Sequence, residues 1–410
     1  NKKEIKKSNI NLIKRNEISN NDLIDLSIRN NSVNDKNLIS RKFNDNNKMN
    51  VTKDQIIPEN IIIINDEYYY CTNHLLYKGN KAEIYKGRER SELRLNTSSS
   101  YHSYDISFSV CIKKEPPFLK SPELDREFNI LNYLQKFSER DKHGIAPCPF
   151  VPTLYNYYYN QDSPSFLVEK LYGNSLNSIF KMCKKKFSLM CSLILMEQMI
   201  GIIQSLHEKG IIHRNLNPNK FLFGKEETSD ILSSKMNLKE INIDPYSQLY
   251  LIDYSSAKFF RENNEKNNNE HIEFKDEVLD CVFTNKNFCS IWAELKMEQS
   301  RRDDLYSLFY IMIYLFLGKL PWMDIKCKSK KERREKIRNL KLCLSNFELC
   351  QRVNKLIENE VELFAFYLNG LSFDDKPNYI YLNQLIKEMQ KKVINSKNNE
   401  YISPMITIRN

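Results

Sequence analysis

Three charged side chains stand where a chain could hold a nucleotide phosphate and its metal ion. Lys113 follows an alternating run, Ile106 to Ile112, that predicts a β-strand, and Glu127 lies on the amphipathic segment after it. Asp253 ends a second predicted strand, which begins at Leu249. A lysine can bind phosphate oxygens, a glutamate can hold that lysine in place, and a carboxylate can bind Mg²⁺. These residue types suggest phosphoryl transfer, which relies on positioning and charge more than on covalent chemistry.

A loop at residues 211–222 holds the polar residues that would act on such a substrate. It resembles the catalytic loop of the protein kinases, H-R-D-x-K-P-x-N, in its framework but not in its chemistry. Asn215 stands at the position of the base, Asn217 at that of the lysine, and Lys220 at that of the metal-binding asparagine. An amide is not a base at any useful pH, and general-base help is worth roughly 10²–10⁴ in rate. Asn217 also removes a cation that would stabilise the transferred group, and the charge of Lys220 repels a second Mg²⁺.

The phosphate-holding motifs of a protein kinase are better kept. Residues 110–113 read V-C-I-K against the V-A-I-K strand, so Lys113 would hold the α- and β-phosphates and Glu127 would pair with it. The D-F-G triplet appears as Asp253-Tyr254-Ser255, where Asp253 keeps the carboxylate that would bind magnesium. Tyr254 can pack where Phe does, but Ser255 removes the glycine that lets this loop move.

The glycine-rich loop that would cover the phosphates is mostly lost. Of its pattern, G-x-G-x-x-G, only Gly79 remains, with Tyr77 and Ala82 at the other two positions. Glycine is used there because only a backbone without side chains can fold closely over a triphosphate. We therefore expect Tyr77 and Lys81 to crowd the nucleotide site or compete for it.

Longer runs resemble one family in particular, the casein kinase I family. The matching runs are Gly173–Leu176, Glu298–Leu305 (E-Q-S-R-R-D-D-L), Gly318–Trp322 (G-K-L-P-W) and Leu371–Tyr379 (L-S-F-D-D-K-P-N-Y), while Ser290-Ile291-Trp292 replaces the family's S-I-N. The resemblance covers about residues 66–390. It implies a two-lobed fold, ATP in the cleft between the lobes, and Ser/Thr phosphorylation of acidic or pre-phosphorylated substrates. This chain departs from the family at the catalytic positions.

The same resemblance implies roles for further residues. Asp304 would cap the catalytic loop from a buried helix, and His213 would join the internal hydrophobic stack. Tyr172 would present hinge backbone groups to adenine. Glu169 falls near the gatekeeper position, or one residue from it if the register is shifted. The expected nucleotide-binding residues are Gly79, Lys113, Glu169, Tyr172 and Leu222.

The order of predicted elements favours an α+β fold, in which a small antiparallel sheet with one key helix precedes a larger, mainly α-helical part. We predict strands at Tyr68–Leu76, Glu83–Arg88, Ile106–Ile112, Phe150–Tyr159 and Ser165–Leu171, and helices at Glu123–Leu134, Leu189–His207 and Leu305–Leu317. The predicted divisions are an Asn/Lys-rich, disordered extension at 1–60, an N-lobe at 61–172, a C-lobe at 173–395 and a tail at 396–410. Polar insertions are expected at 89–104, 225–247 and 262–280. The basic run Lys326–Lys341 should be a solvated loop and helix face, with an anion-docking or nuclear-import patch as the alternative.

Bulk composition argues against several classes of protein. Ten cysteines without a C-x-x-C pair are typical of a reducing compartment, not of a disulfide framework or a zinc site. The net charge of +10 comes without a basic and aromatic nucleic-acid signature. The longest apolar run, Leu308–Leu317, is too short to span a bilayer. Because the chain begins at Asn1, we expect it to be a fragment of a longer protein. The sequence does not exclude a signal peptide that has been removed.

The sequence alone leaves three hypotheses for the function. One of them is a different transferase that uses the same nucleotide in a flipped pose. The favoured hypothesis is a pseudokinase that works as a monomeric protein-binding scaffold or allosteric regulator in the cytoplasm or nucleus, with a kinase or a kinase substrate as its partner. It would bind ATP weakly and without a clear need for Mg²⁺, because Lys220 supplies part of the missing metal charge. The alternative is an active Ser/Thr kinase with a non-standard catalytic loop.

Overall fold

The computed structural model describes the chain from residue 61 to residue 409 with several gaps. The described ranges are 61–64, 68–79, 82–90, 109–119, 122–139, 148, 150–224, 240–264, 267–275, 285–343, 346–396 and 406–409. The predicted extension at 1–60, Lys81 and most of the insertion at 89–104 lie outside these ranges.

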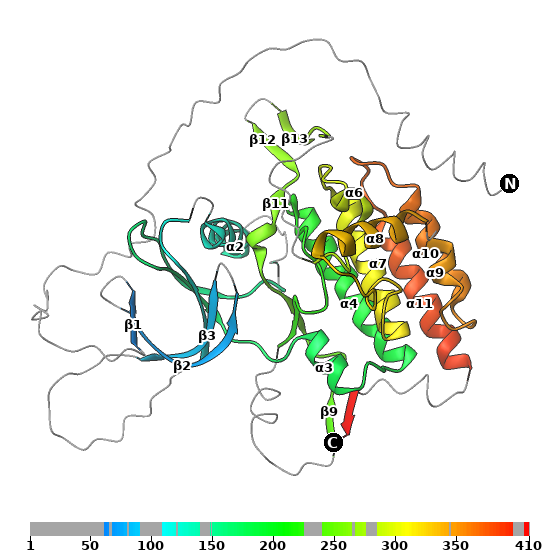
Figure 1. The fold of residues 1–410 in the computed structure, drawn as a ribbon, viewed down its shortest axis with the longest axis horizontal. Helices are drawn as coiled ribbons and strands as arrows, with labels where there is room; N and C mark the ends of the chain where they lie inside the picture. Colours follow the sequence, from blue (N-terminus) through cyan, green and yellow to red (C-terminus); the bar gives the residue numbers. More distant parts are fainter. Residues whose placement is uncertain are drawn as a thin grey trace, which may run out of the picture. The chain divides into compact units, whose positions relative to one another are not determined.

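The first part of the described chain builds one antiparallel sheet with the strand order β1-β2-β3-β4-β6-β5 (Figure 1). Its strands are β1 (Ile61–Ile64), β2 (Tyr68–Lys78), β3 (Glu83–Arg90), β4 (Ser109–Glu115), β5 (Leu154–Tyr158) and β6 (Ser165–Lys170). Val110 and Ile112 of β4 pack with Val168 of β6 in a small core of their own. The sheet therefore places Lys113 on a strand with neighbours on both sides.

Three of the five predicted strands end one or two residues away from the bounds in the structure, and the other two differ by more. The predicted strand Phe150–Tyr159 begins only at Leu154, because Phe150 lies in a turn and its carbonyl accepts a hydrogen bond from Leu251 N at 2.9 Å. Pro152, which has no N–H for a sheet ladder, also separates the turn from the strand. In the other case β4 continues to Glu115, beyond the predicted end at Ile112.

Helix α2 (Glu123–Glu139) follows β4 and contains Glu127. The carboxylate of Glu115 caps its first turn, accepting hydrogen bonds from Glu123 N at 2.8 Å and Leu124 N at 3.4 Å. Phe128 stacks on Tyr157 of β5, with 4.1 Å between the ring centroids. Helix α2 is therefore held by Glu115 of β4 and by Tyr157 of β5. These two contacts orient the helix and, with it, the side chain of Glu127.

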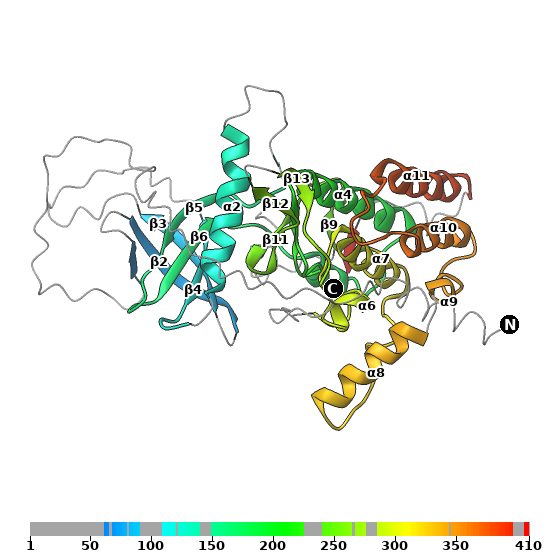
Figure 2. The ribbon, with the colours of Figure 1, turned by 90° about the horizontal axis from the view of Figure 1, so that it is seen from above.

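The second part of the described chain is mainly helical. Its helices are α3 (Leu176–Met182), α4 (Leu189–Glu208), α6 (Ile291–Glu294), α7 (Arg301–Leu317), α8 (Lys330–Cys343), α9 (Asn346–Cys350), α10 (Glu358–Asn369) and α11 (Tyr379–Asn395), with a 3₁₀ turn at Tyr254–Ser256. Helices α4, α7, α10 and α11 pack side by side around the main hydrophobic core (Figures 1 and 2). A sheet part followed by a helical part confirms the predicted α+β class.

The predicted buried helix is present as α7. It is buried from Arg301 to Leu315, as expected of a helix that is apolar on every side. It begins four residues before the predicted Leu305, where Ser300 N donates a hydrogen bond to Asp303 Oδ2 at 2.7 Å. It ends at Gly318, whose φ of 76° is the left-handed conformation that glycine adopts most easily.

By length and composition, α4 is the helix among the described residues that could cross a membrane. Its apolar window has a mean hydropathy of 1.6, and 67% of that window is buried inside the protein. Such burial is typical of the central helix of a globular core, which has a similar length and composition to a membrane-spanning helix. Helix α4 packs against both α7 and α11.

Two pairs of short strands set the positions of the polar loops. Strand β7 (Ile211–Ile212) pairs with β11 (Lys258–Phe259), and β8 (Phe221–Phe223) pairs with β10 (Leu249–Leu251). The loop at 213–220 is therefore anchored by a strand at each end. Asp253 follows β10, so the second pair brings it back to the loop.

The predicted polar insertions and the tail contain strands that the sequence reading did not foresee. Within 225–247, β9 (Glu240–Ile243) pairs with β14 (Ile406–Arg409) of the predicted tail. The segment 262–280 was predicted to be a polar insertion without a named strand, and β12 (Arg261–Asn264) and β13 (Asn267–His271) form a hairpin there. Asn-rich composition hid these strands because asparagine disfavours β-structure.

The basic run Lys326–Lys341 is only partly a solvated face. Several of its charged residues on α8 are exposed, including Lys331 and Lys336, but Lys341 is buried. Its Nζ donates hydrogen bonds to the carbonyls of Lys286 and Cys289, each at 2.7 Å. The prediction was wrong for Lys341 because an ammonium can be buried where carbonyl oxygens replace its water.

Candidate nucleotide site and catalytic loop

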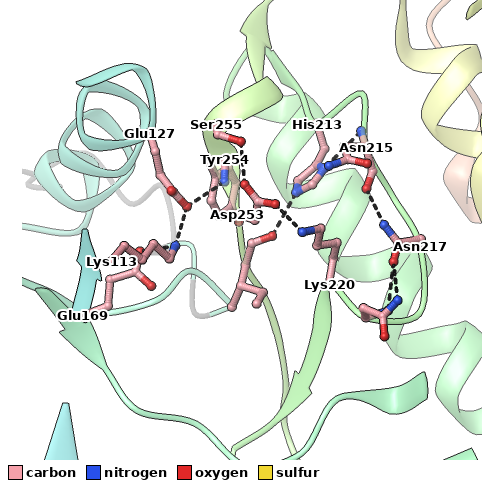
Figure 3. Close-up of polar contacts among 12 residues, drawn as sticks. Lys113, Glu127, Glu169, His213, Asn215, Asn217, Lys220, Asp253, Tyr254 and Ser255 are labelled. Atoms are coloured by element: carbon pink, nitrogen blue, oxygen red, sulfur yellow. Dashed lines mark hydrogen bonds and ion pairs between the residues drawn. The ribbon is translucent and has the colours of Figure 1, made fainter. Parts of the chain in front are cut away.

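Lys113 of β4 lies between two buried carboxylates (Figure 3). Its Nζ is 2.7 Å from Glu127 Oε1 on α2 and 2.9 Å from Glu169 Oε1 on β6. Glu127 Oε1 also accepts a hydrogen bond from Tyr254 N at 2.9 Å. The predicted pairing of Lys113 with Glu127 is therefore present, and it is tied to the segment that contains Asp253.

The part played by Glu169 was missed in the sequence. We expected this residue near the gatekeeper position, and its carboxylate contacts Lys113. The available signal was a carboxylate directly after three apolar residues, Phe166–Val168, in one strand, because a buried carboxylate needs a cation or several hydrogen-bond donors nearby. The strand register explains the contact, since Glu169 pairs with Cys111, two residues from Lys113 on the same face of β4.

The charges of this cluster shift the pKa values of Lys113 and Glu127. Burial alone would lower the pKa of Lys113, but the Glu127 and Glu169 carboxylates raise it well above its ordinary value. Burial raises the pKa of Glu127 to about 7; the ammonium of Lys113 opposes this shift, and Glu169 adds to it. One ammonium thus stays charged beside two carboxylates, and an excess of negative charge is buried with it.

Lys220 occupies the place where a kinase needs a metal ligand. Its Nζ donates a hydrogen bond to Asp253 Oδ2, and Ser255 Oγ donates one to Asp253 Oδ1 at 2.6 Å (Figure 3). Burial alone would raise the pKa of Asp253, but the ammoniums of Lys220 and Lys113 hold it well below its ordinary value. Asp253 also has a φ of 68°, a left-handed conformation that is uncommon for a residue with a side chain. Both oxygens of this carboxylate therefore already have partners.

The catalytic-loop framework is held by Asp304 of α7, as the sequence led us to expect. Its carboxylate accepts hydrogen bonds from His213 N at 2.7 Å and from Arg214 N at 2.9 Å. The same carboxylate lies 3.1 Å from His207 Nε2, and His207 Nδ1 is 2.5 Å from the hydroxyl of Tyr379. One buried acid thus joins α4, α7, α11 and the loop.

His213 lies inside the hydrophobic stack. Its ring meets the ring of Tyr254 edge to face, with 5.3 Å between centroids, and its Nε2 is 3.2 Å from Ile252 O. Burial lowers the pKa of His213, so the imidazole is neutral at pH 7. It therefore acts as a packing residue that connects the loop to the segment after β10.

The two asparagines that replace catalytic residues have unlike surroundings. Both are buried, but Asn215 Oδ1 has no hydrogen-bond partner among the described residues. Asn217 Nδ2 donates to Asn215 O, and Asn217 Oδ1 accepts from Asn219 N, each at 3.1 Å. Asn217 thus holds the loop in shape, whereas the carbonyl of Asn215 is left without a donor.

The residues expected around the nucleotide lie in three places. Tyr77 at the end of β2 is 60% exposed, so it does not fill the site, although a methyl group added to Gly79 would come 2.9 Å from its Cε1. Tyr172 is buried; its ring lies 4.1 Å from that of Tyr250, and its hydroxyl accepts a hydrogen bond from Thr153 N at 3.2 Å. Leu222 lies on β8, where it forms an isolated bridge with Ser175. Lys81 lies outside the described residues.

Curated proteins resemble this chain over much of its length, and one of them shows its family. It is described as a probable casein kinase I homolog of Encephalitozoon cuniculi (strain GB-M1), and it is 33% identical over 241 residues, which cover 58% of this chain and 70% of that protein. The chain belongs to the casein kinase I-like protein kinases. No protein-family model matches the chain.

Protein kinases of this kind use ATP with Mg²⁺, and one of the two residues that would hold the metal is replaced in this chain. In a protein kinase, the magnesium ions are held by the D-F-G aspartate and the catalytic-loop asparagine. Here Lys220 replaces that asparagine and binds the aspartate, Asp253. No group of three His, Cys, Asp or Glu among the described residues could hold a metal ion elsewhere.

Proposed function

We propose that this protein is a casein kinase I-like pseudokinase, which acts by binding a protein and does not transfer phosphate at a kinase rate. The observation that carries the proposal is the hydrogen-bonded ion pair between Lys220 and Asp253, which uses the carboxylate that a kinase gives to its metal ion. The proposed arrangement has two lobes, at residues 61–172 and 173–395, preceded in the sequence by the extension 1–60; the tail 396–410 joins the second lobe where β14 pairs with β9.

The residues at the reaction centre support this proposal. A substrate hydroxyl placed at Asn215 would meet an amide, which can orient it but cannot take its proton. The amide of Asn217 holds the loop through Asn215 and Asn219 instead of offering a cation to the transferred phosphate. The backbone of the loop keeps its contact with α7, because the Asp304 carboxylate accepts hydrogen bonds from the N–H groups of His213 and Arg214.

An active Ser/Thr kinase is the second candidate, and the pair of Lys113 with Glu127 favours it. An active kinase needs this pair in place, and here its atoms are 2.7 Å apart. Charge and positioning can support slow transfer even without a base, because most of the barrier to phosphoryl transfer is lowered in that way.

Labelled ATP and an acidic protein substrate distinguish the two candidates. We expect the purified wild-type protein to transfer no more phosphate than the Lys113→Ala variant. Lys319→Ala is the matched control, because Lys319 also pairs with a carboxylate, that of Asp324, but at the surface. Transfer by wild type and Lys319→Ala that disappears in Lys113→Ala would establish the active kinase instead.

The proposed partner is another protein, either an active kinase or a kinase substrate in the cytoplasm or nucleus. The described surface offers exposed apolar side chains for such a contact on two packed helices, Leu363 and Phe366 on α10 and Ile380 on α11. Exposed apolar side chains that lie close together are typical of interaction sites. A Phe366→Ser variant should bind a purified partner more weakly than wild type, whereas equal binding would exclude this surface.

A further inference from the structure

We propose that the nucleotide site of this protein works without a divalent metal ion, and that the ammonium of Lys220 takes the place of the metal against the phosphates of a nucleoside di- or triphosphate. The inference rests on the proposed function in one respect, namely that this cleft binds a ligand and does not need to catalyse a reaction. It concerns the chemistry of binding, so it can fail while the absence of transfer stands.

The first step is the state of the Asp253 carboxylate. Oδ2 accepts a hydrogen bond from Lys220, and Oδ1 accepts one from Ser255 at 2.6 Å. Magnesium requires close, near-octahedral oxygen ligands. To gain Asp253 as a ligand, it would have to break the ion pair with Lys220 and then remain beside the displaced ammonium, whose charge has the same sign as its own.

The second step is that Lys220 can reach a ligand better than Lys113 can. The side chain of Lys220 is 21% exposed and that of Lys113 is 7% exposed. Lys113 already lies between two carboxylates, Glu127 and Glu169. An ammonium carries three N–H donors, and Asp253 takes one of those of Lys220. The remaining donors can bind phosphate oxygens while the ion pair stays formed.

The third step is the charge of the whole group. Lys113 and Lys220 contribute +2, and Glu127, Glu169 and Asp253 contribute −3 when all are ionised, so the five side chains carry −1 above the raised pKa of Glu127 and no net charge when Glu127 is protonated. A metal-bound kinase site is far more positive at this place. We therefore expect the site to bind a polyphosphate weakly, with an affinity that depends mainly on the charge of Lys220.

The experiment measures the dissociation constant of ATP for the full chain by titration calorimetry, once with excess EDTA and once with excess MgCl₂. Wild type should bind ATP in both, with constants that agree within about threefold. Lys220→Asn, which restores the family's residue, should lose about tenfold or more in EDTA and regain affinity with MgCl₂. Lys319→Asn removes an exposed lysine that pairs with Asp324 and should behave as wild type.

Three results would overturn the inference. Wild-type binding that needs MgCl₂, no binding of ATP in either buffer, or a Lys220→Asn variant that binds in EDTA as wild type does would each exclude Lys220 as the replacement for the metal. A thermal melt of each variant shows that it is folded, so a loss of binding reports on the site. Lys113-dependent phosphate transfer would overturn the proposed function, but it would leave the metal dependence of binding as a separate measurement.

Discussion

Glu169 Oε1 lies 2.9 Å from Lys113 Nζ, so the ammonium that would hold nucleotide phosphates is shared with a second buried carboxylate. In the sequence this residue stands near the expected gatekeeper position, at the inner end of the nucleotide site. Its carboxylate competes with any phosphate for Lys113 and adds a negative charge to the group. We therefore expect Glu169 to weaken the binding of a nucleotide.

We predict that Glu169→Gln tightens the binding of ATP by about three- to tenfold, because it removes one buried negative charge beside Lys113. Titration calorimetry in EDTA measures the effect without the complication of a metal. Glu388→Gln is the matched control, since Glu388 is exposed on α11 and its substitution should leave the affinity unchanged. Weaker binding in Glu169→Gln would mean that Glu169 positions Lys113 for the ligand.

Removal of the shared cation should cost stability. Lys113→Met leaves Glu127 and Glu169 buried without their partner, and breaking a buried pair in this way lowers the free energy of unfolding by about 3–5 kcal/mol. Urea denaturation followed by circular dichroism measures it. Adding Glu127→Gln and Glu169→Gln to the same chain should return most of the loss, and a triple variant as unstable as Lys113→Met would contradict this account.

The raised pKa of Glu127 predicts a pH dependence of stability with a definite sign. Below pH 4.5, its ordinary pKa, Glu127 is protonated in both states; between 4.5 and about 7 only the folded state holds the proton. The contribution of Glu127 to stability is therefore complete below pH 4.5 and is lost as the pH rises through about 7. The free energy of unfolding of wild type, compared with that of Glu127→Gln, should fall across this window.

The check on this pH prediction is a comparison of denaturation curves at several pH values. Glu388→Gln, a change at an exposed glutamate, should follow wild type at every pH. Parallel curves for wild type and Glu127→Gln would show that the Glu127 carboxyl titrates alike in the folded and unfolded states.

The two loop asparagines should respond differently to replacement by leucine. Asn215→Leu should change the free energy of unfolding by less than about 1 kcal/mol, because Oδ1 of Asn215 has no partner to lose. Asn217→Leu should lower it by about 1–3 kcal/mol, because Asn217 gives up hydrogen bonds to Asn215 and Asn219. Urea denaturation of the two variants tests the contrast, and equal losses would refute it.

Much of the fold and the identity of most candidate site residues could be predicted from the sequence. The apolar periodicity of α7 and the alternation along β4 depend on residues close together in the chain, so a local pattern reveals them. Motif spacing also identified Lys113, Glu127 and Asp253. Strand β9, in an Asn-rich segment, was missed because it pairs with β14, more than 150 residues away. The local composition does not reveal a pairing partner at that distance.

What the sequence determined by itself is therefore which residues occupy the kinase positions, above all that Asn215, Asn217 and Lys220 replace chemical groups. It also suggested a repulsion between Lys220 and magnesium, because charge is a property of residue type. Only the tertiary structure decided that Lys220 binds Asp253 and that Glu169 shares Lys113. Those contacts join residues 33 and 56 positions apart, and they depend on strand register and backbone direction, which residue types at fixed positions do not specify.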